Sequence, residues 1–250
     1  MRKSSAILVI LLALAAIAGV VLWRMDGKRS GFRDADAPLG MPPSGAPDHR
    51  FHFPSAWQTA QIPRATRFDS PLGTEHGGLA YNAQKFQEMN HYRGGRHTGD
   101  DLNGIGGMNT DLGDPVFSTA DGLVLYAGEP SPGWGKLVVI AHAAPHGRTL
   151  HSMYAHLDRI DVNRGSLVPR GGKIGSVGTA NGNYPAHLHF EMRASDGVDI
   201  GAGYAMDPLN RLDPMATVAA LRNAPADDLA PSPLAAALKF TGLRDAPPAE

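Results

Sequence analysis

Short runs of β-forming residues, separated by turn residues, occupy the centre of the chain and constrain its fold more than any other feature. The runs cover 115–118, 122–127, 136–142 and 149–156. Tripeptides typical of turns lie between them: Ala120-Asp121-Gly122, Gly133-Trp134-Gly135 and Pro145-His146-Gly147. Such short loops join antiparallel strands, because parallel strands need longer crossover connections. We therefore expect a mainly β domain built on antiparallel sheet.

The rest of the chain divides by composition. Its 250 residues suffice for one good core with accessory segments. Residues 26–64 are rich in Gly, Pro and Asp, which predicts a flexible linker. We place the folded domain at 65–215. Residues 216–250 are expected to form a mobile tail with a short helix, and a helix is also predicted directly after Asp213.

The N-terminus carries an uncharged apolar run from Ala6 to Trp23 behind Arg2 and Lys3. As a helix, its 18 residues would be roughly 27 Å long, close to a hydrocarbon core of about 30 Å. We expect residues 1–25 to form a cytoplasmic stub and a transmembrane helix. The protein would then cross the inner membrane once through 6–23, with the remainder facing the periplasm or cell wall. Cleavage as a signal peptide is the alternative.

Charge and cysteine content exclude several classes of function. The formal net charge is −1 and the basic residues form no stripe, so no nucleic-acid partner is expected. The chain has no cysteine, so a metal site must use His, Asp or Glu. It also lacks the His-Glu-x-x-His and Gly-x-Ser-x-Gly motifs of other hydrolases.

The segment Ala186-His187-Leu188-His189-Phe190-Glu191 is the strongest candidate for a site. On a strand, residues two apart point to the same side, so His187 and His189 would project together from the face opposite Leu188 and Phe190. A second segment, His97-Thr98-Gly99-Asp100-Asp101, places an imidazole and a carboxylate four residues apart. With one histidine of the pair, they would supply the donors of a catalytic zinc site.

A third segment, Tyr154-Ala155-His156-Leu157, ends the last β-type run. The order of the three segments, with Gly113 to Gly122 and Gly171 to Gly175 between them, resembles the lysostaphin-type (LytM-like) zinc metallopeptidases over roughly 95–212. The resemblance implies an antiparallel β-sandwich or half-barrel of the duplicated hybrid motif kind. It also implies an endopeptidase acting on the stem peptides or cross-bridges of peptidoglycan.

The resemblance further implies a role for each motif residue. His97, Asp101 and His189 would bind Zn²⁺, and His156 and His187 would transfer protons, with the general base undecided between the two. Tyr92 is the candidate for a tyrosine that assists the oxyanion. The alternative function is a catalytically silent envelope module that activates another wall hydrolase, and a regulatory envelope protein would then be its partner.

The chain departs from the family pattern in two places. The segment 102–112 is longer than the usual connection, and we expect it to form a loop that borders the cleft. Ala186 separates Pro185 from His187, whereas proline directly precedes the histidine pair in the family. His142, at the end of a Val-Val-Ile run, is expected to be structural.

Overall fold

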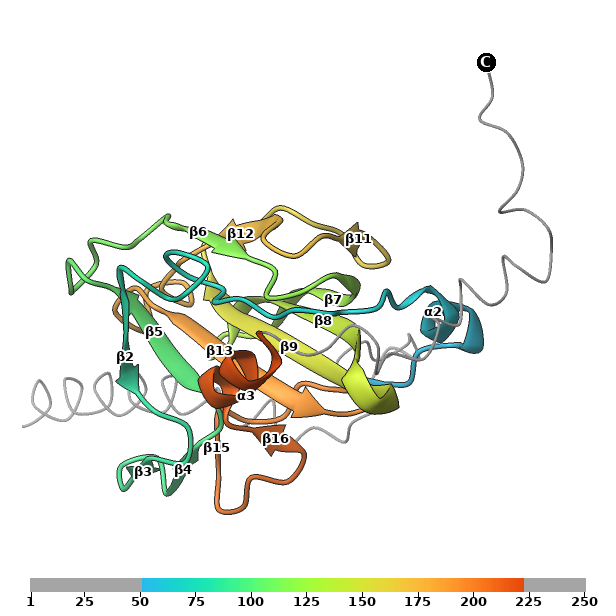
Figure 1. Ribbon diagram of the computed structural model, residues 1–250. Helices are drawn as coiled ribbons and strands as arrows, with labels where there is room; N and C mark the ends of the chain where they lie inside the picture. The colour runs from blue at the N-terminus through green and yellow to red at the C-terminus, as the bar shows by residue number, and fades with distance from the viewer. Residues whose placement is uncertain (1–50, 223–250) are drawn as a thin grey trace, which may run out of the picture.

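The computed structural model describes residues 51–222 of the chain. Its main element is an eight-stranded sheet with the strand order β11-β7-β8-β9-β13-β5-β2, in which β16 also pairs with β13 (Figure 1). Every pair of strands in it is antiparallel, as predicted. The strands are β2 (Ala80–Gln84), β5 (Asp100–Gly104), β7 (Gly122–Ser131), β8 (Gly135–Ala144), β9 (Arg148–Leu157), β11 (Leu167–Val168), β13 (Leu188–Ala194) and β16 (Arg211–Leu212).

Three smaller sheets complete the strands of the described region. One of them joins β4 to both β3 and β15 at one end of the main sheet (Figure 1). The members are β6 (Pro115–Phe117), β10 (Arg159–Ile160) and β12 (Lys173–Ser176); β3 (Met89–Asn90), β4 (Gly95–His97) and β15 (Tyr204–Ala205); and β1 (Phe51–His52) with β14 (Val198–Asp199). The four predicted β runs thus correspond to β6, β7, β8 and β9.

The central strands are covered on both faces, because successive side chains alternate between two hydrophobic cores. In β8, Val138 lies in the first core and Val139 in the second. In β9, Tyr154 lies in the first core and Met153 in the second. Both faces of this sheet are therefore buried, which holds its strands in a fixed register beneath the site.

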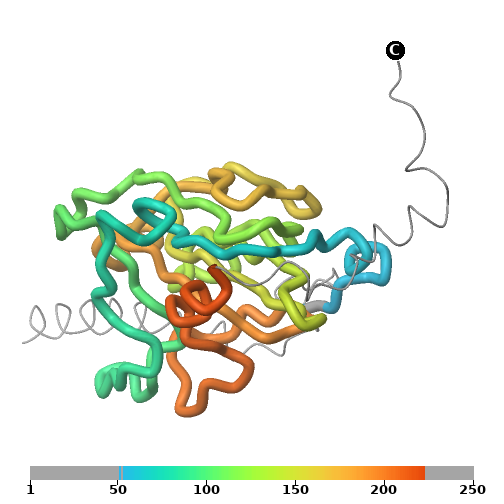
Figure 2. The backbone as a smooth tube through the Cα atoms, viewed as in Figure 1, coloured from blue at the N-terminus to red at the C-terminus, as the bar shows by residue number. Residues whose placement is uncertain are grey.

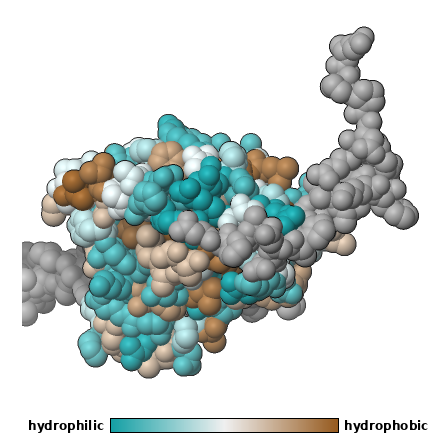
Figure 3. Space-filling view, in the orientation of Figure 1, coloured by the Kyte–Doolittle hydropathy of each residue, from teal (hydrophilic) through white to brown (hydrophobic). Residues whose placement is uncertain are grey.

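Helix α3 and an extended segment cover one of these faces. Helix α3 (Pro214–Leu221) is capped at its N-terminus by Asp213, whose side chain accepts a hydrogen bond from the backbone N–H of Ala216. It confirms the helix predicted after Asp213. Helix α2 (Ala56–Gln61) is short, and a 3₁₀ turn spans Pro145–Gly147. The segment 62–78 runs across the sheet (Figure 2) and buries Phe68 and Leu72 in the first core. The surface in this view is mostly hydrophilic, with separate hydrophobic patches (Figure 3).

Three expectations fall partly or wholly outside the described residues. The predicted anchor at 6–23 and the tail beyond 222 lie outside them. Of the predicted linker, residues 51–64 are described and contain β1 and α2. Between residues 51 and 222, none of the helices has the length and apolar character needed to cross a membrane.

Candidate metal and catalytic site

Three strands place the predicted metal ligands together. Asp101 on β5 lies directly opposite His189 on β13 in the antiparallel ladder. His97 ends β4, and its side chain is almost fully buried, as is that of His189. Strand β13 directs Leu188 and Phe190 into the first core, so His189 projects from the other face, as the alternating pattern predicted. The register of the sheet therefore brings together residues that are far apart in sequence.

Gly99 allows this close approach. A Cβ atom at this position would lie 2.5 Å from the backbone oxygen of Phe190 and 2.9 Å from Nε2 of His189. Any other residue would therefore push β4 and β5 away from β13. The glycine between His97 and Asp101 is thus needed to bring both residues against His189.

The donor atoms of these three residues converge on one point. Nε2 of His97 lies 3.1 Å from Nδ1 of His189 and 3.2 Å from Oδ1 of Asp101, and the last two atoms are 3.0 Å apart. Burial would raise the pKa of Asp101, but hydrogen bonds from His189 and His97 outweigh it and hold that pKa well below its usual range. A carboxylate with two imidazole nitrogens at such distances fits a metal ion of the zinc type.

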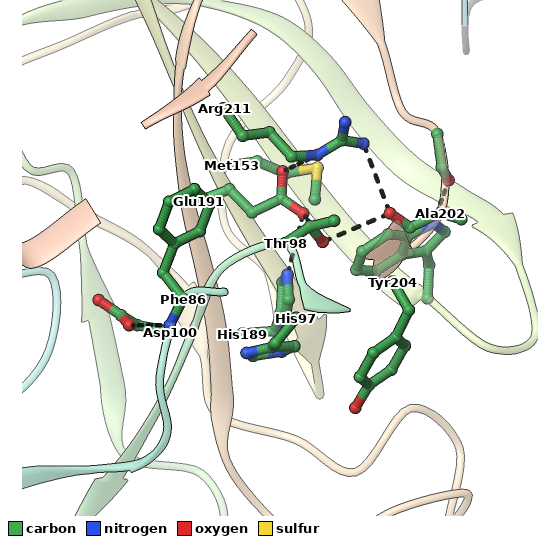
Figure 4. Close-up of polar contacts among 12 residues, drawn as sticks. Phe86, His97, Thr98, Asp100, Met153, His189, Glu191, Ala202, Tyr204 and Arg211 are labelled. Carbon is green, nitrogen blue, oxygen red and sulfur yellow. Dashed lines mark hydrogen bonds and ion pairs between the residues drawn. The ribbon is translucent and has the colours of Figure 1, made fainter. Parts of the chain in front are cut away.

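The orientation of His189 is set by Glu191, which has no exposed surface. Oε1 of Glu191 lies 3.1 Å from Nε2 of His189 and accepts a 2.7 Å hydrogen bond from the hydroxyl of Thr98 (Figure 4). Its other oxygen contacts the guanidinium groups of Arg193 and Arg211. Because the carboxylate holds Nε2 as a donor, Nδ1 is the nitrogen that faces the other ligands.

His156 is held in a conformation that residues other than glycine rarely adopt. Its φ is 64°, in the left-handed region, where backbone strain is common at functional sites. Its Nδ1 lies 3.1 Å from the carbonyl oxygen of Trp134, so Nδ1 carries the hydrogen and Nε2 keeps its lone pair. Burial, helped by electrostatic repulsion from His187 and His189, lowers the pKa of His156 well below its ordinary value. The ring is therefore neutral near pH 7.

His187 has the same hydrogen-bond arrangement. Its Nδ1 lies 2.8 Å from the carbonyl oxygen of Pro185, which leaves Nε2 as the acceptor. That Nε2 lies 3.6 Å from Oδ1 of Asp101, and the ring centroid is 4.8 Å from that of His156. The two predicted proton-transfer histidines are therefore neighbours, and each can accept a proton at Nε2.

One cleft contains all five predicted residues and is walled by aromatic rings that sequence reasoning missed. Tyr204 packs on His97, and Trp134 packs on His156. Tyr184 also packs on His156, with ring centroids 4.8 Å apart. Tyr92, the predicted oxyanion residue, is 84% exposed and is not among the residues that line the cleft. Tyr184 directly precedes the Pro185 motif, whereas no local pattern indicates Tyr204 or Trp134.

The segment after Asp101 differs from the expected loop. Residues up to Gly104 belong to β5, and Leu102 is buried in the first core. The following residues are not among those that line the cleft. Instead, the side-chain oxygen of Asn109 accepts a 2.7 Å hydrogen bond from the backbone N–H of Ala186. The segment therefore supports the backbone next to His187 without lining the cleft.

The remaining predicted histidine, His142, lies outside the cleft and is fully buried. Its Nδ1 is 2.9 Å from the backbone oxygen of Asp121, and its Nε2 is 2.7 Å from the hydroxyl of Ser152. Burial lowers its pKa to about 4, although the hydrogen bond with the Asp121 backbone and the charge of Asp121 favour the protonated form. This residue is structural, as expected.

Comparison with known proteins defines the class. A family model described as Peptidase family M23 matches residues 97–208, which include all five predicted metal-binding and proton-transfer residues. The "Lipoprotein NlpD" of Yersinia enterocolitica is 38% identical over 81 residues, which are 32% of this chain and 78% of that protein. The chain therefore belongs to peptidase family M23, the lysostaphin-type family that its motifs predicted.

Other relatives share only the corresponding region. The "Peptidoglycan DD-endopeptidase ShyB" of Vibrio cholerae is 40% identical over 83 residues, 33% of this chain and 18% of that protein. The "Murein hydrolase activator NlpD" of Escherichia coli is 38% identical over 81 residues, 32% of this chain and 20% of that protein. The chain thus spans a fifth or less of these two relatives. An NMR structure of lysostaphin is 20% identical, with a TM-score of 0.47 covering 62% of this chain and 56% of that one.

Proposed function

We propose that this protein is a zinc-dependent endopeptidase that hydrolyses peptide bonds of peptidoglycan in the cell envelope. The observation that carries the proposal is the convergence of three donor atoms, each within 3.2 Å of the others, beside two histidines with free Nε2 lone pairs. Membership of a peptidase family and the activity in the name of its relative ShyB support this choice of reaction and substrate.

In this proposal His97, Asp101 and His189 hold the zinc ion. When bound, zinc would supply a Lewis acid that polarises the scissile carbonyl and makes a water molecule more acidic. Mg²⁺ and Ca²⁺ fit this donor set less well, because they prefer oxygen ligands. Glu191 contributes by fixing the ring of His189 in the coordinating orientation.

His156 and His187 perform the proton transfers in this proposal. Each ring has Nδ1 tied to a carbonyl oxygen, so Nε2 can take a proton from the attacking water. The protonated ring can then donate that proton to the nitrogen of the leaving amine. Both rings border the same cleft, and either can act as the base.

The site of action follows from the N-terminal segment. We propose that the apolar run 6–23 anchors the protein in the inner membrane, with the domain facing the periplasm or cell wall. Peptidoglycan lies in that compartment, so an anchored domain would meet its substrate directly.

The second candidate is a catalytically silent module that activates another wall hydrolase, because the E. coli relative is named as a murein hydrolase activator. The complete donor set and both cleft histidines favour the enzyme, since an activator needs neither. A partner hydrolase would be required only in the second case.

Digestion of purified sacculi separates the two candidates. The zinc-loaded full chain is incubated with sacculi, and the released muropeptides are identified by mass. We expect cleaved stem or cross-bridge peptides with the wild type and none with Asp101→Ala. Sacculi that stay intact with the wild type, but are degraded when a wall hydrolase is added, would instead identify an activator.

A further inference from the structure

A guanidinium group lies at the wall of the cleft and belongs to none of the motifs. Arg93 sits in the turn between β3 and β4, and its backbone N–H donates to the side-chain oxygen of Asn90 at 3.0 Å. Its side chain is half-buried and lines the same cleft as the metal donors. The turn therefore presents a positive charge to whatever occupies the cleft.

Two tyrosine rings hold this guanidinium in place. Its carbon lies 5.7 Å from the ring centroid of Tyr184 and 5.8 Å from that of Tyr204, within cation–π range. Tyr204 packs on His97 and Tyr184 packs on His156. Arg93 therefore contacts one tyrosine that packs on the metal donor His97 and another that packs on the proton-transfer residue His156.

Within residues 51–222, Arg93 has no carboxylate partner. Among the described residues that line the cleft, Asp101 is the single carboxylate, and three histidines engage it. Other arginines of the domain do have acidic partners: Arg159 contacts Asp161, and Arg193 and Arg211 contact Glu191. A guanidinium that is pre-oriented by aromatic rings and lacks a counter-charge is a receptor for a planar anion.

We propose that Arg93 binds a free carboxylate of the substrate peptide beside the scissile bond. The inference rests on the proposed function and narrows its substrate: the site takes an acidic stem peptide, which carries free carboxylates, rather than a neutral glycine bridge. Arg93 is a specificity-determining residue in this account. The two tyrosines reduce the conformational entropy lost when it pairs.

The test compares native sacculi with sacculi whose carboxylates have been converted to amides with carbodiimide and ammonia. The variants are Arg93→Met, Arg93→Lys and, as the matched control, Arg96→Met. Arg96 is a nearby exposed arginine that does not line the cleft and donates to the backbone oxygen of Gln87. Cleavage is measured with the zinc-loaded full chain, and binding is measured separately by co-sedimentation of the metal-free chain.

For native sacculi, Arg93→Met should raise the half-saturating concentration about tenfold, the loss expected for one charge-assisted hydrogen bond, with the maximal rate unchanged. Arg93→Lys should recover part of the loss, and Arg96→Met should match the wild type. Amidated sacculi should bind the wild type as weakly as native sacculi bind Arg93→Met.

Equal binding of native and amidated sacculi by the wild type would overturn the proposal, as would equal binding by wild type and Arg93→Met. An effect of Arg93→Met that amidation does not reproduce would also overturn it, by indicating a phosphate or another anion. If the wild type cleaves neither substrate, the proposed function fails, while co-sedimentation still decides the role of Arg93.

Discussion

The buried carboxylate of Glu191 determines which nitrogen of His189 faces the metal donors. Burial opposes the charge on Glu191, but Arg193, His189 and Arg211 together outweigh it and hold its pKa far below the usual range. The residue is therefore an anion in the folded protein. Its contact with Nε2 leaves Nδ1 for the proposed zinc ion, in the carboxylate–histidine–zinc arrangement of many metal sites.

Glu191→Gln should weaken zinc binding by about 10- to 100-fold, the range typical for loss of such an outer partner. The measurement is competition with a chelator, with thermal unfolding recorded in parallel because Arg193 and Arg211 lose their counter-charge. Thr98→Val is the control, since it removes another bond to Oε1 and leaves the contact with His189. Unchanged zinc affinity together with a lowered melting temperature would make Glu191 purely structural.

At the scale of secondary structure, the predictable elements were those with a local pattern. Strands β7, β8 and β9 have continuous β-type runs bounded by turn residues, and the structure extends them by only a few residues. Strands β3, β4 and β15 are two or three residues long and carry no such signal. They form because β4 pairs with partners on both sides, which is a tertiary effect.

The same distinction applies to the site. The five motif residues could be predicted because their motifs resemble those of a known family, and the two-residue spacing of His187 and His189 places both on one side of a strand. Trp134, Tyr204 and Arg93 reach the cleft from separate turns and a short strand, so only the assembled sheets reveal them. The resemblance predicts a tyrosine before the His97 motif, for which Tyr92 is the only nearby candidate. Tyr92 is exposed, and the tyrosine that packs on His97 is Tyr204, more than 100 residues later.

For the whole molecule, His142 links stability to pH. Its pKa is about 4 in the folded protein, against about 6.5 in an unfolded chain. Between these values the unfolded chain binds a proton that the native protein does not, so stability is lost as pH falls from about 6.5 towards 4. The slope is roughly 1.4 kcal/mol per pH unit, which gives about 3 kcal/mol over this window.

His142→Gln should therefore lose about 3 kcal/mol less than the wild type when the pH falls from 7 to 4. Urea unfolding of both metal-free proteins at the two pH values measures the difference, and titration of the other histidines is common to both. Parallel loss of stability in the two proteins would show that His142 is accessible to protons in the native state.

The central claim is the division of the cleft into residues that hold metal and residues that move protons. It is tested most directly by measuring zinc content and cleavage of sacculi on the same preparations of three variants, His189→Ala, His187→Ala and His156→Ala. The first should lose both zinc and activity. The other two should keep one zinc per chain and lose activity about 10²- to 10⁴-fold, as removal of a general acid or base does. A zinc-free His187→Ala protein, or a His156→Ala protein with full zinc and wild-type cleavage, would contradict the account.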